Sequence, residues 1–208
     1  MIPETRRRLR DSWGFCERHA WGGLAVEMAF RHRFLLGQTI LYADLMERCL
    51  DAFNLQGPWQ ARRLAGRLVG DGHCMMCDMN AYGAGRGYAR PALIEQGRRT
   101  DDLRTLAMET SSHWRKAVCA VCEGHSGAAR CRRHLLEDIA RNCRIALGRH
   151  RNALQQTHEH LLAYERSFVW GFRDTDRPED RAALFNAIGW FSGWRPLLAL
   201  MDETPSSF

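Results

Sequence analysis

The chain has almost no lysine: Lys116 is the single one among 208 residues, and arginine supplies the other basic side chains. The formal net charge of +6 therefore reflects arginine, a skew that a GC-rich genome produces as readily as selection for phosphate contacts. Two clusters are dense enough to bind nucleic acid: Arg6, Arg7, Arg8 and Arg10, and Arg130, Arg132 and Arg133. Solvated helix faces are the commoner origin of such clusters, so nucleic acid is the secondary expectation for a partner.

Long apolar runs are also absent. No segment approaches the roughly 20 apolar residues that a membrane-spanning helix requires. The opening MIPETRRRLRDSW carries basic residues without an apolar run behind them, so no secretory signal is predicted. We expect a cytoplasmic protein that does not enter a membrane.

The alternation of polar and apolar residues that marks a strand does not persist anywhere, while helical spacing recurs along most of the chain. Helices are predicted over 16–53 with a break at Gly37, over 59–69, from Thr100 onward, from Cys131 to about Trp170 with a bend at Gly148, and after Pro178. Residues 70–99 are rich in glycine and are the least helical part. We expect an all-α protein, a helical bundle with irregular metal-binding loops, forming a single domain over 1–208.

The helical faces assign several residues to the core. Leu41, Leu45, Cys49 and Ala52 share one face, and Leu135, Ile139, Cys143, Ala146 and Leu147 form another apolar stripe. Cys49 and Cys143 are therefore predicted to be buried core cysteines. The last helix should bury Leu184, Ile188 and Phe191, and Trp190 and Trp194 should serve as core or interface anchors.

The eight cysteines follow a spacing that favours metal binding over disulfides, which reduced compartments do not sustain. Six of them fall into four short motifs: Cys16-x-x-His19, Cys74-x-x-Cys77, Cys119-x-x-Cys122 and Cys131-x-x-His134. Two ligands separated by three positions share a face at a helix start, so sulfur and imidazole converge on one ion.

The segment 117–135 contains the strongest of these signals, a zinc knuckle. Cys119 and Cys122 can bind from a tight turn, and Cys131 and His134 follow after eight intervening residues at a predicted helix start. Together they form a Cys₃His set suited to tetrahedral zinc.

A second Cys₃His set pairs Cys16 and His19 with Cys74 and Cys77. The crossed pairing, in which the two CxxH motifs exchange partners, stays open, although the short loop in 117–135 favours the uncrossed one. His73 and His125 lie beside the pairs and could substitute as ligands, but surface histidines are the commoner case.

Four protein ligands leave no open coordination position, and this closed arrangement is typical of structural zinc. We therefore expect two Zn²⁺ per chain in a non-enzymatic module that binds a protein partner or itself. The alternative is a redox protein that uses CxxC dithiols or an iron–sulfur cluster. A third interpretation is a metalloenzyme with an open site near His73 or His125.

Two further patterns carry weaker signals. Residues 82–88 read YGAGRGY, which resembles a phosphate-binding loop, but no strand precedes it and the P-loop lysine is missing. His158, Glu159, His160 and Glu165 could form a helical metal site, although a polar helix surface explains them equally well.

Three segments, GFCERHAW, LGQTILYADLMERCL and RDTDRPEDRAALFNAIGWFSG, resemble a bacterial family of unknown function. Its members combine CPxC-type pairs with a GFCxxHaw motif, and the resemblance covers about half of the chain. It implies metal ligation by Cys16, His19, Cys74 and Cys77. The chain departs from the pattern in two ways: Met75 stands where the family often has proline, and the CxxC that commonly precedes the GFCxxHaw cysteine is missing before Cys16.

Overall fold

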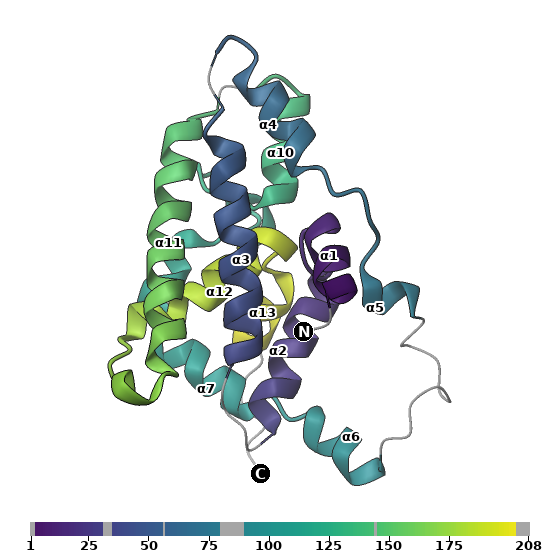
Figure 1. Cartoon of the computed structure of the whole chain (residues 1–208), viewed down its shortest axis with the longest axis vertical. Coiled ribbons are helices and arrows are strands. Elements are labelled where there is room, and N and C mark those ends of the chain that lie inside the picture. The colour runs from purple at the N-terminus through teal and green to yellow at the C-terminus, as the bar shows by residue number, and fades with distance from the viewer. Residues whose placement is uncertain (1–2, 31–34, 56, 80–89, 144, 203–208) are drawn as a thin grey trace.

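The computed structural model describes residues 3–30, 35–55, 57–79, 90–143 and 145–202 (Figure 1). Within these ranges the chain is helical without a strand, which confirms the predicted fold class, and no helix is long and apolar enough to cross a membrane. The elements, with η for 3₁₀ helices, are α1 (Pro3–Asp11), α2 (Glu17–Ala29), α3 (Leu36–Phe53), α4 (Gln60–Leu68), α5 (Met75–Asp78), α6 (Pro91–Gly97), α7 (Asp101–Glu109), α8 (Ser111–Trp114), η1 (Arg115–Ala117), α9 (Ala120–Glu123), α10 (Arg132–Ala140), α11 (Leu147–Ser167), η2 (Trp170–Phe172), α12 (Pro178–Ser192) and α13 (Arg195–Asp202).

Helices α3, α11 and α12 form the centre of the bundle. α11 packs against both of the others, and α3 and α11 lie side by side along the long axis (Figure 1). The predicted apolar face of α3 is buried in full: Leu41, Leu45, Cys49 and Ala52. Cys49 is therefore a core residue, as its position on that face predicts.

Helix α12 is buried along most of its length. Pro178 occupies its first turn as predicted, and Leu184, Ile188 and Phe191 are buried. The rings of Trp13 and Phe191 stack at 5.8 Å, which joins the segment before α2 to this helix. Trp190 and Trp194 are also buried, so both tryptophans serve the core.

The turn after α12 fastens the C-terminal helices to the start of α2. Gly193 has a left-handed φ of 115°, and its carbonyl accepts a 2.8 Å hydrogen bond from Trp21 Nε1. The Ser192 hydroxyl donates to the Phe15 carbonyl at 2.9 Å, and the Arg195 amide donates to Glu17 Oε1 at 3.1 Å. A Cβ at 193 would displace the Glu17 carboxylate, the end of a flexible side chain, so it is the backbone conformation that requires glycine.

The helix predicted from Cys131 to about Trp170 is interrupted. α10 ends at Ala140, where Asn142 adopts a left-handed φ of 53° and the Cys143 amide donates to the Asp138 carbonyl at 2.9 Å. This is the six-residue hydrogen-bonded helix ending in which asparagine replaces the usual glycine. Cys143 and Ala146 consequently face solvent, and the prediction that Cys143 lies in the core is wrong.

Candidate metal centres

All four short motifs begin at a helix start. Cys16 and Cys131 are the N-cap residues of α2 and α10, with ψ of 163° and 168°, and a histidine follows in each first turn. Cys74 and Cys119 are the N-caps of the four-residue helices α5 and α9, with ψ of 120° and 121°. The chain thus uses the same two local structures twice, and each brings two ligand atoms to one side of a helical turn.

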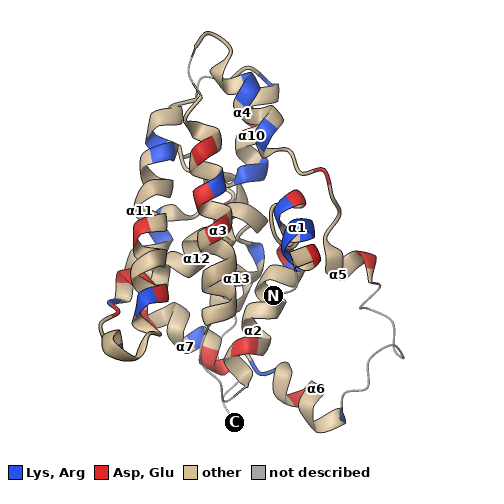
Figure 2. Cartoon of the chain, in the orientation of Figure 1, with Lys and Arg blue, Asp and Glu red and all other residues tan. Residues whose placement is uncertain are grey.

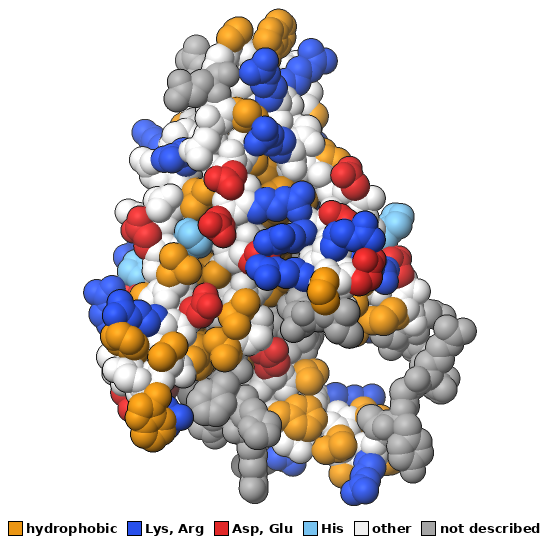
Figure 3. Space-filling model, in the orientation of Figure 1, with side chains coloured by type: hydrophobic (Ala, Val, Ile, Leu, Met, Phe, Trp, Pro, Cys, Tyr) orange, Lys and Arg blue, Asp and Glu red, His pale blue; other side chains and the backbone are white. Residues whose placement is uncertain are grey.

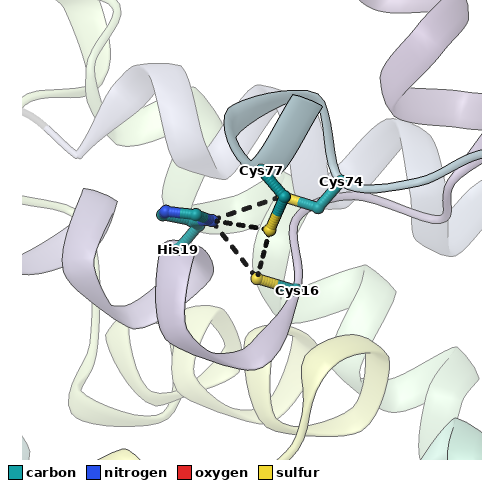
Figure 4. A group of neighbouring side chains, drawn as sticks. All are labelled: Cys16, His19, Cys74 and Cys77. Atoms are coloured by element: carbon teal, nitrogen blue, oxygen red, sulfur yellow. Dashed lines mark hydrogen bonds between the residues drawn. The ribbon is translucent and has the colours of Figure 1, made fainter. Parts of the chain in front are cut away.

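Centre 1 consists of Cys16, His19, Cys74 and Cys77, which point toward one another from the starts of α2 and α5 (Figure 4). Nδ1 of His19 lies 3.3 Å from Cys16 Sγ and 3.5 Å from each of the other two sulfurs. The sulfurs of Cys16 and Cys77 are 3.7 Å apart. All four residues are half-buried.

Centre 2 consists of Cys119, Cys122, Cys131 and His134, at the starts of α9 and α10. Nδ1 of His134 lies 3.2 Å from the sulfurs of Cys119 and Cys131 and 3.5 Å from that of Cys122. The sulfurs of Cys122 and Cys131 are 3.9 Å apart. Only Cys122 is half-buried; the other three residues are buried.

The two groups settle the pairing of the motifs. In each, the four ligand atoms lie within 4.8 Å of one another, so each group could hold a metal ion, and the pairing is the uncrossed one. All eight cysteines are free, and no disulfide competes with metal binding. Among the described residues neither His73 nor His125 joins a group; His125 Nε2 instead pairs with Glu123 at 2.8 Å.

The thiols of centre 2 lie close enough to shift one another's pKa values. Contacts with the side chains of Cys122 and Cys131 lower the pKa of Cys119, and the contacts with Cys119 raise the pKa of the other two. A divalent cation bound in the middle of the group would deprotonate the coordinating thiols.

In centre 1, burial of the thiols and hydrogen bonds from backbone N–H groups shift the cysteine pKa values in opposite directions. Burial raises the pKa of Cys16 to about 11. Burial acts in the same direction on Cys74, but backbone N–H groups of Cys16, Cys77 and Met76 outweigh it and the pKa of Cys74 is lowered. The helix starts thus favour a thiolate at Cys74, the form that binds metal.

Contacts that spacing alone could not reveal hold α5 in place. Arg8 of α1 forms a 2.8 Å ion pair with Asp78, and the Asp71 amide donates to the Asp11 carbonyl at 2.9 Å. α5 buries none of its four residues, and it lies outside the main bundle in Figure 1. Centre 1 therefore joins a peripheral segment to α2.

The two arginine clusters are engaged within the chain. Arg6 and Arg10 both pair with Asp44 of α3, and Arg7 pairs with Glu4 at 2.8 Å. Basic residues predominate on α1 and acidic residues on the facing part of α3 (Figure 2), and both signs are interspersed over that face (Figure 3). These pairs give the cluster a structural explanation.

The second cluster, Arg130, Arg132 and Arg133, is engaged as well. Arg130 pairs with Asp138 at 2.6 Å and Arg133 with Glu137 at 3.0 Å. Arg132 donates to the carbonyls of Leu68 and Phe191 at 2.9 and 3.3 Å. It thereby fastens α10 to the ends of α4 and α12.

Two of the α11 residues that could have formed a metal site have other partners. His160 Nδ1 lies 2.6 Å from the buried carboxylate of Asp180, while Glu159 accepts from Gln155 at 3.0 Å, so these residues do not form a described metal group. Sequence reasoning missed Asp180, whose partner is twenty residues away on another helix. The glycine-rich segment 82–88 lies outside the described residues.

Comparison of the chain with protein-family models, with curated proteins and with solved structures found no match.

Proposed function

We propose that the chain is a helical module stabilised by two structural zinc ions, one in each Cys₃His centre. The spacing of the ligand atoms carries this proposal. Tetrahedral bonds of about 2.3 Å to sulfur and 2.1 Å to nitrogen separate two sulfurs by about 3.8 Å and sulfur from nitrogen by about 3.6 Å. In centre 1 the sulfurs of Cys16 and Cys77 lie 3.7 Å apart and the histidine nitrogen lies 3.3–3.5 Å from the three sulfurs. In centre 2 the sulfurs of Cys122 and Cys131 lie 3.9 Å apart and the histidine nitrogen lies 3.2–3.5 Å from the three sulfurs. All other pairs of ligand atoms lie within 4.8 Å.

The same arrangement of ligand atoms weighs against an iron–sulfur cluster and against a catalytic zinc site with an open position. An iron–sulfur cluster distributes its protein ligands over separate iron atoms, whereas all four atoms here lie within 4.8 Å of one another. A catalytic zinc ion keeps one position for water, and each group supplies four protein ligands. Both considerations favour closed, single-ion sites with a structural role.

The test is elemental analysis of the anaerobically purified full-length protein together with its absorption spectrum. We expect two zinc ions per chain, no visible absorbance, and the loss of one ion in each of the variants Cys74→Ser and Cys131→Ser. Iron with visible absorbance contradicts the zinc assignment. Zinc content unchanged in both variants contradicts the ligand assignment.

We further propose that the module acts by binding protein, including a second copy of itself. Trp170 in η2 is 79% exposed and lies beneath the Arg173 guanidinium, 4.3 Å from its ring centroid, and Val169 and Phe172 are exposed beside it. Exposed tryptophan and arginine are typical interface anchors. Sedimentation velocity over a range of concentrations should show self-association that Trp170→Ser weakens. A monomer at every concentration contradicts self-association and restricts the proposal to other proteins.

A further inference from the structure

A cavity of about 440 Å³ lies between centre 2 and the bundle. Its walls come from η1, from residues 127–130 between Cys122 and Cys131, from the beginning of α11 and from one side of α12. Pockets that bind small molecules have volumes of roughly 300–1,000 Å³. The cavity is therefore large enough for a ligand of a few rings.

The body of the cavity is apolar. Ile145, Leu154 and Trp190 line it together with several alanines, among them Ala153 of α11. Trp190 belongs to the buried core and Leu154 is likewise buried, so this wall is rigid. An apolar ring system would displace water from it favourably.

The charges around the cavity are unbalanced. Arg130 and Asp138 both line it, but they neutralise each other through their 2.6 Å ion pair. Burial, and secondarily the charge of Arg130, lowers the pKa of His150, which is therefore neutral at physiological pH. Lys116 and Arg149 remain; both are exposed, and neither has an ion-pair partner among the described residues. The mouth consequently carries two positive charges, which favours an anion.

We propose that this cavity binds a small organic anion with an apolar ring body and a carboxylate or sulfonate group, the body against Leu154 and Trp190 and the acid group at Lys116 and Arg149. The proposal goes beyond the proposed metal-binding role. A protein that holds two zinc ions and binds no such anion refutes it and leaves the metal assignment intact.

The test uses the full-length, zinc-loaded protein and the fluorescent probe anilinonaphthalene sulfonate. We expect saturable binding at one site, from which naphthoate displaces the probe at least about tenfold better than neutral naphthalene methanol does, because only the former carries the acid group. Equal displacement by the two competitors overturns the assignment of an anion site, and absence of saturable binding overturns the pocket itself.

Two variants locate the site. Ala153→Phe fills the cavity from an exposed helix position and should abolish binding, while Arg149→Glu should weaken it about tenfold or more. Arg63→Glu, an equal charge change at an exposed position of α4, is the matched control and should bind as the unmodified protein does. Zinc content and far-ultraviolet circular dichroism establish that each variant is folded. Wild-type binding by folded Arg149→Glu overturns the proposal even if Ala153→Phe does not fold.

Discussion

The two metal centres have the same ligand set and the same local helix starts, yet they lie in different surroundings. In centre 2 the side chains of Cys119, Cys131 and His134 are buried and the two cysteines belong to the hydrophobic core. In centre 1 all four ligands are half-buried, and α5 supplies two of them without burying any of its own residues. A metal ion bound in centre 2 would therefore complete a packed core, whereas one bound in centre 1 would secure a segment that buries little of its own surface.

The difference shows that ligand chemistry does not determine how much a structural metal contributes to stability. Ions of equal affinity stabilise only the part of the chain that unfolds when they leave. Loss of the ion from centre 2 exposes core sulfur and imidazole. Loss from centre 1 releases α5 while α2 stays packed through Ala20, Trp21 and Leu24.

The turn after α12 contacts residues next to both centres. Ser192, Gly193 and Arg195 contact the start of α2 beside centre 1. The backbone N–H of Trp194, between Gly193 and Arg195, contacts the Cys122 sulfur of centre 2 and acts to lower the pKa of that thiol. A change in this turn should therefore reach both centres, unlike a change in either ligand set.

The largest effect is expected for Cys131→Ser. Structural zinc binds with about 10–16 kcal/mol of apparent free energy, comparable with the whole stability of about 5–15 kcal/mol of a typical domain. We expect loss of one zinc ion and of cooperative thermal unfolding, measured by circular dichroism. Cys143→Ser, which removes an exposed thiol outside both centres, is the matched control and should melt like the unmodified protein. If Cys131→Ser unfolds cooperatively at the Tm of the unmodified protein, centre 2 does not make the large contribution to stability proposed here.

Gly193→Ala should have the next largest effect and should reach both centres. The new methyl group collides with the Glu17 carboxylate, and φ is 115°. The unfavourable backbone conformation costs about 1–3 kcal/mol, and displacement of the Glu17 carboxylate also breaks its hydrogen bond from the Arg195 amide. Thermal melts and metal release to pyridylazo-resorcinol should show lower stability and faster loss of both ions. Gly148→Ala on α11, where the added methyl meets nothing, should leave metal release unchanged and raise stability by about 0.4–1 kcal/mol. Faster release from one centre alone would argue against the connecting turn.

Substitution of Asp180 should weaken the helical bundle at a position outside both centres. Burial raises its pKa, but hydrogen bonds from His160 and from the Arg177 backbone outweigh burial, so the pKa of folded Asp180 lies below its ordinary 3.8. The carboxylate thus stabilises the fold above about pH 4, and this contribution is lost as pH falls through the lower folded pKa.

Asp180→Asn should therefore cost about 1.5–3 kcal/mol near neutral pH. Urea titrations should show the difference between the two proteins narrowing as the medium is acidified, and metal release at neutral pH should be unchanged. Because acid removes metal from both proteins, the difference between them isolates Asp180. If the difference in unfolding free energy stays the same at low pH, the ionised carboxylate of Asp180 is not the source of the stabilisation.

The sequence predicted the short cysteine and histidine motifs but not the contacts between residues on separate helices. The four motifs predicted the eight residues that come together in the two groups, since each pair depends only on three-residue spacing at a helix start. The Asp180–His160 pair and the Arg8–Asp78 pair join separate helices, and no periodicity encodes them. Cys143 was misplaced because asparagine, with no glycine or proline nearby, ended α10 and interrupted a regular apolar stripe.

Cys74→Ser should produce a smaller global effect than any change above. We expect loss of one zinc ion but a cost of only about 1 kcal/mol, which for a chain of this size lowers Tm by about 2–4 °C. The change should instead be local: hydrogen exchange should accelerate over 71–79 and stay unchanged in α3 and α12. A loss of cooperative unfolding equal to that of Cys131→Ser would remove the distinction between the two centres.

Arg8→Ala tests the weakest contact on which centre 1 depends. Its ion pair with Asp78 is 2.8 Å long but about four-tenths exposed on both sides, so it contributes about 0–1 kcal/mol and is screened by salt. At low ionic strength we expect faster metal release from centre 1, an unchanged rate at centre 2, and no measurable change in Tm. Arg7→Ala, which removes a pair confined to α1, should alter neither rate. Because Asp78 of α5 is the ion-pair partner of Arg8, acceleration at centre 2 would mean that the two centres are energetically linked.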